Sequence, residues 1–174
     1  MYRLLFLMLA LGLAPSALQA KADAQIRGYV ISIADGDTLT LLTAEKARVK
    51  VRLAEIDTPE KMQPYGQRAK QELASLAFNH NVQVSVIDTD RYGRVVGRVS
   101  VDAIDINAEM VVRGAAWVYR DYLRRTDLLP LEADARRQRK GLWALPEHER
   151  MPPWQWRRKQ RDDRAAADLT TNNH

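Results

Sequence analysis

The residues of this sequence that could do chemistry gather in two short segments, "IADGDTLTL" at residues 33–41 and "RLAEIDTPE" at residues 52–60. In the first, two aspartates flank a glycine before an apolar strand. In the second, an aspartate and a glutamate follow a strand. Asp-Gly before alternating apolar residues is a common hairpin turn, whereas aspartates one residue apart can also bind a hard cation. The pattern is open to both interpretations.

Strand periodicity separates the two aspartates of the first segment. Successive side chains of a strand point to opposite faces, so Asp37 shares a face with Leu39 and Leu41, which are expected inside. A carboxylate on an inward face is costly unless it meets a cation. Asp35 lies within the turn, where a structural role suffices. We therefore expect Asp37 to need a charged partner.

The strand that ends in the second segment could bring that partner. If it neighbours the strand that starts at Asp37, the start of one strand lies beside the end of the other, and Asp57 comes close to Asp37. Two adjacent carboxylates repel unless they share a proton or a metal ion. The sequence has no cysteine and its three histidines are far apart, so oxygen ligands favour Ca²⁺ or Mg²⁺. The alternative is that Asp57 only caps the following helix.

Strand and helix patterns around these segments predict an α+β, mainly β, domain. Three short alternating stretches within residues 26–56 form a meander, and Pro59 stops the sheet. A helix, a hairpin and two more helices are predicted near residues 65–80, 81–101, 107–114 and 130–140. Gly97 indicates a close backbone approach in the hairpin. Five short strands with a helix after the third fit a five-stranded OB-fold Greek-key barrel with about three helices.

The two ends of the chain are expected to lie outside this barrel. Arg3 precedes an apolar run too short to span a bilayer, followed by small residues, which is typical of a signal peptide over residues 1–22. The alternative is an uncleaved membrane anchor. The sequence thus predicts an exported protein, periplasmic or extracellular, with its domain over residues 23–146. Residues 147–174 lack apolar periodicity, and we expect them to form a basic, flexible tail.

Charge is unevenly distributed along the chain. The formal net charge is +5, and all of this excess comes from residues 113–174. A basic C-terminal third indicates a polyanionic partner, either nucleic acid or an anionic envelope surface. Charge alone is equally compatible with solvated helix faces.

Five short segments, taken in order, resemble the signature of the staphylococcal nuclease-like (thermonuclease) family. They are "DGDT", "RLAEIDTPE", "YG" at the start of a helix, "DRYGR" and "INAEMVVRGAAWVY", followed by a basic helix ending in "GLW". The resemblance covers roughly residues 26–145. It implies an OB-fold barrel with helices that uses Ca²⁺ to hydrolyse phosphodiesters in DNA and RNA, leaving a 3′-phosphate and a 5′-hydroxyl.

The resemblance also implies a cation site and a base. By position, Asp37 and Asp57 match direct calcium ligands, and the backbone carbonyl of Thr58 matches a third. Glu60 matches the glutamate that orients the attacking water and is assigned as general base. These types suit the reaction, because a cation neutralises a phosphoryl oxygen and a nearby carboxylate can take the proton of the water.

The same resemblance implies a set of residues that bind phosphate. Arg52 and Arg94 match two arginines that grip the phosphate of the substrate. Guanidinium forks fit phosphate oxygens and stay charged, so they can stabilise the charge of the transition state. Arg91 and Tyr92 match a pair that contacts a terminal phosphate. Counting from the glycine at 114 places Tyr122 at the position of a ligand-contacting tyrosine.

A hypothesis from another class is a non-catalytic OB-fold module that binds nucleic acid through its basic face. The presence of the whole catalytic set favours the enzyme, namely Asp37, Arg52, Asp57, Glu60 and Arg94. Because these residues address phosphates rather than base edges, we expect low sequence specificity. We also expect a monomer with no obligate protein partner, and membrane contact only through the signal peptide or the basic tail.

Overall fold

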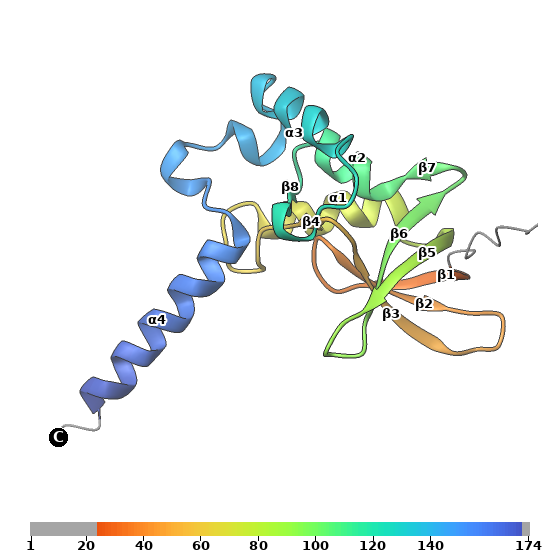
Figure 1. The fold of residues 1–174 in the computed structure, drawn as a ribbon, viewed down its shortest axis with the longest axis horizontal. Coiled ribbons are helices and arrows are strands. Elements are labelled where there is room, and N and C mark those ends of the chain that lie inside the picture. Colours follow the sequence, from red (N-terminus) through yellow and green to blue (C-terminus); the bar gives the residue numbers. More distant parts are fainter. Residues whose placement is uncertain (1–23, 172–174) are drawn as a thin grey trace, which may run out of the picture.

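Five strands pair around a closed barrel in the computed structural model, which describes residues 24–171 (Figure 1). Their order is β3-β2-β1-β5-β6, and β3 also pairs with β6 to close the barrel. The closing pair is parallel, whereas the others are antiparallel. The strands are β1 (Gln25–Ile33), β2 (Thr38–Leu42), β3 (Arg48–Leu53), β5 (Asn81–Thr89) and β6 (Val95–Val101). This arrangement confirms the predicted five-stranded barrel of the OB type.

Three shorter strands and four α-helices surround this barrel among the described residues. The short strands are β4 (Ile56–Asp57), β7 (Ile104–Asp105) and β8 (Trp117–Val118), and β4 pairs with β8 as a separate two-stranded sheet. The α-helices are α1 (Gly66–Ala77), α2 (Ile106–Val112), α3 (Leu128–Arg137) and α4 (Pro153–Thr171). Short 3₁₀ turns are η1 (Arg120–Tyr122), η2 (Gly141–Ala144) and η3 (Glu147–Glu149).

The barrel core follows from the alternation of the strands. Leu39 of β2 lies opposite Val51 of β3, and both are fully buried, whereas Lys50 between the inward residues of β3 is exposed. Gly97 of β6 allows the closest contact, because a Cβ at this position would lie 2.5 Å from Cγ1 of Val84. The close approach predicted at this glycine is confirmed.

Helix α2 closes one end of the barrel through a buried asparagine. Asn107 donates from its side-chain amide to the carbonyl oxygens of Ala54 at 2.9 Å and Gly97 at 3.3 Å. Its side-chain oxygen accepts the N–H of Val99 at 2.9 Å. The side chain of Asn107 thus satisfies backbone groups of β6 and of the residue directly after β3. These bonds hold the end of β3 in place, where the chain turns into β4.

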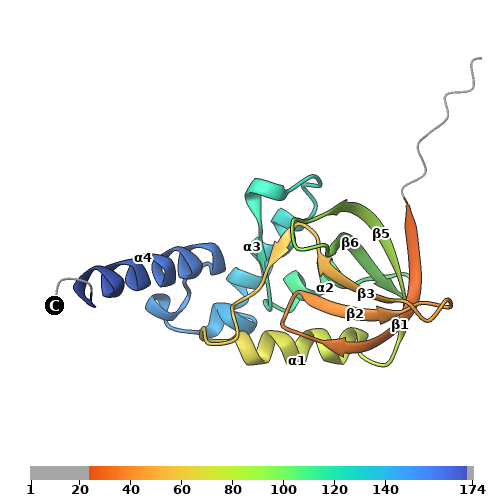
Figure 2. The ribbon, with the colours of Figure 1, turned by 90° about the horizontal axis from the view of Figure 1, so that it is seen from below.

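The C-terminal segment corrects the sequence prediction. Residues 147–174 were expected to form a flexible tail and three helices were expected in all, but Pro153–Thr171 form a fourth helix, α4, which projects from the body (Figures 1 and 2). The side chains of residues 158–168 of this helix are exposed, so this part needs no apolar stripe, and a search for periodicity could not detect it. The predicted signal peptide lies outside the described residues. Within residues 24–171, no helix has the length and apolar character required to cross a membrane.

Candidate active site

Asp37 reaches the barrel interior through the tight turn before β2. The carboxylate of Asp35 accepts the N–H of Asp37 at 3.1 Å, which is the local bond of a turn aspartate. Gly36 lets this turn press against the chain after β4, because a Cβ there would lie 2.7 Å from Oγ1 of Thr58. Asp37 is 6% exposed and accepts the N–H of Thr58 at 3.3 Å. The turn therefore aims one aspartate inward, as predicted.

Arg52 joins the two predicted cation ligands. It lies opposite Thr38 in the β2–β3 ladder, and its Nη2 is 2.9 Å from Oδ1 of Asp57 and 3.4 Å from Oδ2 of Asp37. Its Nη1 donates to the backbone carbonyls of residues 53 and 56 at 3.3 and 3.2 Å, which fixes the orientation of the guanidinium. The predicted meeting of Asp37 and Asp57 at one barrel mouth is confirmed.

Asp57 is the most confined of these carboxylates. It is 1% exposed on β4, opposite Trp117 of β8. Burial raises the pKa of Asp57 and the negative charge of Asp37 adds to this effect, while bonds from Arg157 and the charge of Arg52 lower it; on balance the pKa is raised. Burial of Asp57 is thus not fully offset by its arginine partners, and a cation at this position would favour its charged carboxylate.

Glu60 lies two residues after Thr58, at the rim of the site. Its backbone N–H donates to the side chain of Gln63 at 3.1 Å, and Gly66 presses on its carbonyl so closely that a Cβ would lie 1.9 Å away. Its carboxylate is 2.7 Å from Nη1 of Arg157. The loop holds Glu60 firmly while its side chain stays 41% exposed, so water can reach it.

The β5–β6 hairpin brings the second arginine. Nε of Arg94 lies 2.7 Å from the carboxylate of Asp90, and Nη1 donates to the hydroxyl of Thr38 at 3.3 Å. That hydroxyl in turn donates to Asp37 at 3.0 Å. Arg91 donates to the hydroxyl of Tyr92 at 2.8 Å, and Arg94 lies over the same ring, 5.6 Å from its centroid. The predicted phosphate-binding residues of this hairpin thus adjoin the carboxylate site.

Two residues near the site were missed by the sequence analysis, and the first is Tyr119. The predicted Tyr122 is 65% exposed on η1 and packs edge-on against Tyr119, with ring centroids 4.7 Å apart. Tyr119 was not singled out, yet burial and then the charge of Asp57 raise its pKa, so it faces the carboxylates. The motif "WVYRDY" contains both tyrosines. The prediction of Tyr122 came from counting forward from Gly114. Tyr119, which directly follows the short strand at residues 117–118, could have been found from its position next to that strand.

Arg157 of α4 is the second residue that was missed. Its Nη2 lies 2.8 Å from Oδ2 of Asp57, and its Nη1 lies 3.2 Å from Oδ1 of the same residue and 2.7 Å from Oε1 of Glu60. These contacts join residues 97 and 100 positions apart. No local pattern in the sequence could have signalled them.

The donor set fits a hard cation with water in its coordination shell. Within the described part of the chain, no group of three or more His, Cys, Asp or Glu side chains could hold a metal ion. The available donors are the carboxylates of Asp37 and Asp57, with that of Asp35 beside Asp37, together with backbone carbonyls and water. Ca²⁺ accepts such a mixture of carboxylate, carbonyl and water oxygens, so the residues present are compatible with it. The role of the Thr58 carbonyl stays a prediction.

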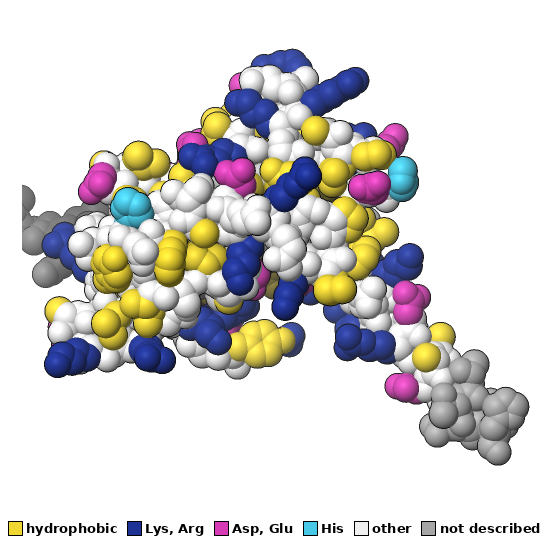
Figure 3. All heavy atoms as spheres, turned by 180° about the vertical axis from the view of Figure 1, so that it is seen from behind, with side chains coloured by type: hydrophobic (Ala, Val, Ile, Leu, Met, Phe, Trp, Pro, Cys, Tyr) yellow, Lys and Arg dark blue, Asp and Glu magenta, His cyan; other side chains and the backbone are white. Residues whose placement is uncertain are grey.

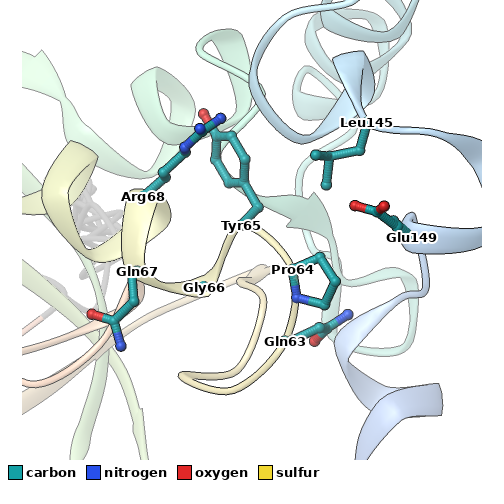
Figure 4. Close-up of a pocket in the computed structure, with 8 residues that line it drawn as sticks. All are labelled: Gln63, Pro64, Tyr65, Gly66, Gln67, Arg68, Leu145 and Glu149. Carbon is teal, nitrogen blue, oxygen red and sulfur yellow. The ribbon is translucent and has the colours of Figure 1, made fainter.

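A separate hollow lies beside the start of α1. It measures about 320 Å³ and is lined by residues 63–68 together with Leu145 and Glu149. In Figure 4 these last two residues face Gln63 and Pro64 across the hollow, and Tyr65 and Arg68 close its other side. None of the predicted site residues lines it. The predicted site residues thus lie apart from this hollow.

Comparisons with known proteins bear on the whole domain. Residues 50–145 match the family model described as "Staphylococcal nuclease homologue". The chain belongs to the staphylococcal nuclease family. It is similar to the "Micrococcal nuclease" of Shigella flexneri, with 45% identity over 148 residues that cover 79% of this chain and 83% of that protein.

Two further relatives from Escherichia coli extend the similarity. "Protein ParB" is 43% identical over 166 residues, covering 89% of this chain and 92% of the relative. A protein named "Uncharacterized endonuclease" is 41% identical over 137 residues, covering 78% and 88%. The predicted family and enzyme class, a nuclease, are thereby confirmed. The family match ends at residue 145, so Arg157 and α4 lie beyond it.

Proposed function

We propose that this member of the staphylococcal nuclease family is an exported, Ca²⁺-dependent enzyme that hydrolyses phosphodiester bonds of both DNA and RNA with low sequence specificity. The observation that carries the proposal is the arrangement around Arg52, whose guanidinium lies between Asp37 and Asp57 at one barrel mouth. Arg94 reaches the same mouth through the hydroxyl of Thr38. The names of the relatives, a micrococcal nuclease and an endonuclease, support the same reaction class.

The carboxylates would hold the cation. Asp37 and Asp57 provide two buried anionic donors, and the backbone carbonyl of Thr58 would provide a third oxygen. When bound there, Ca²⁺ supplies a positive charge that neutralises a phosphoryl oxygen and positions a water molecule.

The arginines stabilise charge on the phosphate. Hydrolysis adds a water oxygen to phosphorus and breaks the bond to the 5′ oxygen, so negative charge accumulates on the phosphoryl oxygens. Arg52 is held by two backbone carbonyls, so its fork is oriented before substrate binds. Arg94 approaches from the neighbouring hairpin and supplies a second fork. Glu60, partly exposed at the rim, would take the proton of the attacking water. The leaving 5′ oxygen takes up a proton from solvent water, so the products would be a 3′-phosphate and a 5′-hydroxyl.

The surface around the site favours phosphate over base recognition. Tyr92 is 69% exposed beside Arg91 on the hairpin, where the two can contact a terminal phosphate. Tyr122 offers an exposed ring next to Tyr119. Contacts to phosphate and sugar carry no direct sequence information, and these groups occur in DNA and in RNA. We therefore propose low sequence specificity and no strong preference for either polymer.

Export rests on the sequence of residues 1–22. The test is to express the full gene product in a bacterial host and to determine its N-terminus by mass spectrometry in the periplasmic and medium fractions. Cleavage after residue 20, 22 or 24 is expected. An intact N-terminus in the membrane fraction would contradict export as a free protein.

Cleavage assays test the reaction itself. The mature chain is incubated with single-stranded DNA or RNA in Ca²⁺ and then in excess chelator, and cleavage of both polymers is expected only with Ca²⁺. Arg52→Ala should lower kcat by about 100-fold or more, the usual loss of a transition-state donor. Arg48→Ala is the matched control, because Arg48 is exposed on the same strand. Full activity in Arg52→Ala, or cleavage that survives the chelator, would refute the mechanism.

A further inference from the structure

Helix α4 inserts an arginine into the site that the proposed function assigns to the cation. Both carboxylate oxygens of Asp57 accept hydrogen bonds from Arg157, at 2.8 and 3.2 Å, and Glu60 accepts a third at 2.7 Å. Oδ1 of Asp57 also accepts Nη2 of Arg52 at 2.9 Å. The oxygens that would face a cation and its water are therefore already engaged by guanidinium groups.

The start of α4 is anchored beside the site, so this contact is built into the fold. The ring of Trp154 stacks on Tyr119, with centroids 5.3 Å apart and planes 4° apart, and lies edge-on to Trp117 at 5.9 Å. The side-chain amide of Gln63 donates to the carbonyl of Met151, just before the helix. These contacts place Arg157, one turn after Trp154, over the carboxylates, while the helix beyond it projects from the body (Figure 2).

The charges of the site explain why the guanidinium stays there. Asp37, Asp57 and Glu60 bring three carboxylates together, and the carboxyl of Asp35 lies beside Asp37. Arg52 supplies one guanidinium in direct contact with Asp37 and Asp57, while Arg94 is paired with Asp90. Arg157 supplies a second guanidinium, and it forms a bidentate pair with Asp57, the strongest geometry for such a contact. Burial alone would lower the pKa of Arg157, but its bonds to Asp57 and Glu60 raise that pKa on balance.

The remaining arginines of α4 have no such role. Arg158, Arg161 and Arg164 are exposed, and basic and acidic side chains both lie along the projecting helix (Figure 3). The net charge of the helix is therefore not what brings it to the site. The contact depends on Arg157 and on the aromatic anchor.

We propose that Arg157 competes with the divalent cation for Asp57 and Glu60, so that helix α4 sets how much Ca²⁺ the enzyme needs. This inference rests on the proposed function, because it assumes that these carboxylates serve the cation and the water. Cation binding then requires that Arg157 leaves Asp57. The apparent affinity is reduced by the fraction of molecules in which Arg157 has left.

Titration calorimetry of the full chain with CaCl₂, without nucleic acid, tests the proposal directly. The proteins are the wild type, Arg157→Ala, Arg157→Gln and the control Arg161→Ala, which removes the same charge one turn further along the helix. If the arginine is bound in about ten molecules for each one in which it is free, both Arg157 variants bind Ca²⁺ about tenfold more tightly than the wild type. Arg161→Ala stays within about twofold of the wild type, because distant surface charges are screened.

The outcomes separate this inference from the proposed function. Equal or weaker Ca²⁺ binding by both Arg157 variants, with normal binding by the wild type, overturns the competition alone. Unchanged Ca²⁺ affinity with a raised KM for DNA assigns Arg157 to substrate binding and also overturns it. No heat of Ca²⁺ binding in the wild type, together with cleavage that survives the chelator, overturns the proposed function as well. If Arg157→Ala fails to fold, Arg157→Gln, which keeps a polar side chain, decides.

Discussion

Two buried carboxylate sites of this protein use arginine partners in opposite ways. Glu55 is 3% exposed and is surrounded by donors: Arg98 bonds it at 2.8 Å, and the backbone N–H groups of Arg124 and Arg125 donate at 2.9 Å each. Burial raises the pKa of Glu55, but the bonds from Arg98 and from the two backbone groups outweigh it, so the pKa is lowered. This site ties the turn between β3 and β4 to the chain around η1.

The Asp37–Asp57 site lacks this balance. Asp57 is 1% exposed and its pKa is raised rather than lowered, first because of burial and then because of the negative charge of Asp37. Its arginine partners offset only part of these two effects, whereas the donors around Glu55 outweigh its burial. We expect a carboxylate in the first situation to gain more from a bound cation than one in the second.

Removal of one charge from the functional pair should give the largest effect. We expect Asp37→Asn to lower Ca²⁺-dependent cleavage by about 100-fold or more, because a cation ligand is lost. Its free energy of unfolding without Ca²⁺ should stay equal to or above that of the wild type, since a desolvated charge has gone. Rates on single-stranded DNA and urea unfolding in chelator measure the two quantities. Normal cleavage would remove Asp37 from the site.

Removal of the Glu55 carboxylate should lower stability and leave most of the activity, the reverse of the effect expected for Asp37→Asn. We expect Glu55→Ala to lower the free energy of unfolding by about 3 kcal/mol, because it leaves partly buried arginines without their partner. The folded fraction should keep most of its cleavage rate. The control is Glu72→Ala, which breaks a more exposed pair with Arg113 and should cost less than about 1 kcal/mol. Equal losses in both variants would contradict the special role of Glu55.

Calcium should stabilise the fold through the functional pair. At about 100 times the Kd, ligand binding adds about 2.7 kcal/mol to the free energy of unfolding. For a chain of this size the midpoint temperature should rise by roughly 5–10 °C. Differential scanning calorimetry with and without CaCl₂ measures the shift, which Asp37→Asn should abolish. A full shift in that variant would place the cation elsewhere.

The paired carboxylate should also control acid stability. Because the pKa of Glu55 is lower in the folded state, its stabilisation is fully present above its ordinary pKa of 4.5 and is lost as the pH falls through the folded value. The acid branch of the stability curve should therefore be shallower in Glu55→Gln than in the wild type. Urea unfolding between pH 3 and 6 in chelator measures this. Identical slopes would show that Glu55 does not titrate on unfolding.

The turn aspartate should give the smallest effect on activity. Asp35→Asn keeps an oxygen that can accept the N–H of Asp37, so we expect cleavage to change by less than about tenfold. The same assay as for Asp37→Asn measures it. A loss as large as that of Asp37→Asn would make Asp35 part of the cation site.

Strand alternation and strand pairing predicted the two aspartates of the site, Asp37 and Asp57. The alternation of β2 and its pairing with β3 follow from neighbouring residues, so the sequence placed Asp37 beside Asp57 correctly. The family resemblance singled out Arg52 as a phosphate-binding residue, and the structure places it between the two aspartates. These residues are joined by short-range pairing, for which sequence patterns are reliable.

Contacts between distant segments could not be predicted in this way. Arg157 reaches the site because Trp154 stacks on Tyr119, a contact set by the path of the chain through α3 and η2. Helix α4 has no apolar stripe, so nothing local marks its start as packed against the body and residues 158–168 as exposed. Gly114 and Gly141, which approach so closely that a Cβ on one would lie 2.3 Å from the carbonyl of the other, belong to the same long-range contact set.

The parallel pairing of β3 with β6 has a consequence for folding kinetics. It joins Val51 to Val95 and places Arg52 beside Val96, two residues after Arg94. Pairing of segments so far apart in sequence carries a large loop-closure cost and forms late. Each hairpin alone holds only one of the two arginines, so nuclease activity should emerge only when the barrel closes. An unfinished chain would therefore be harmless to the nucleic acids of the cell that makes it.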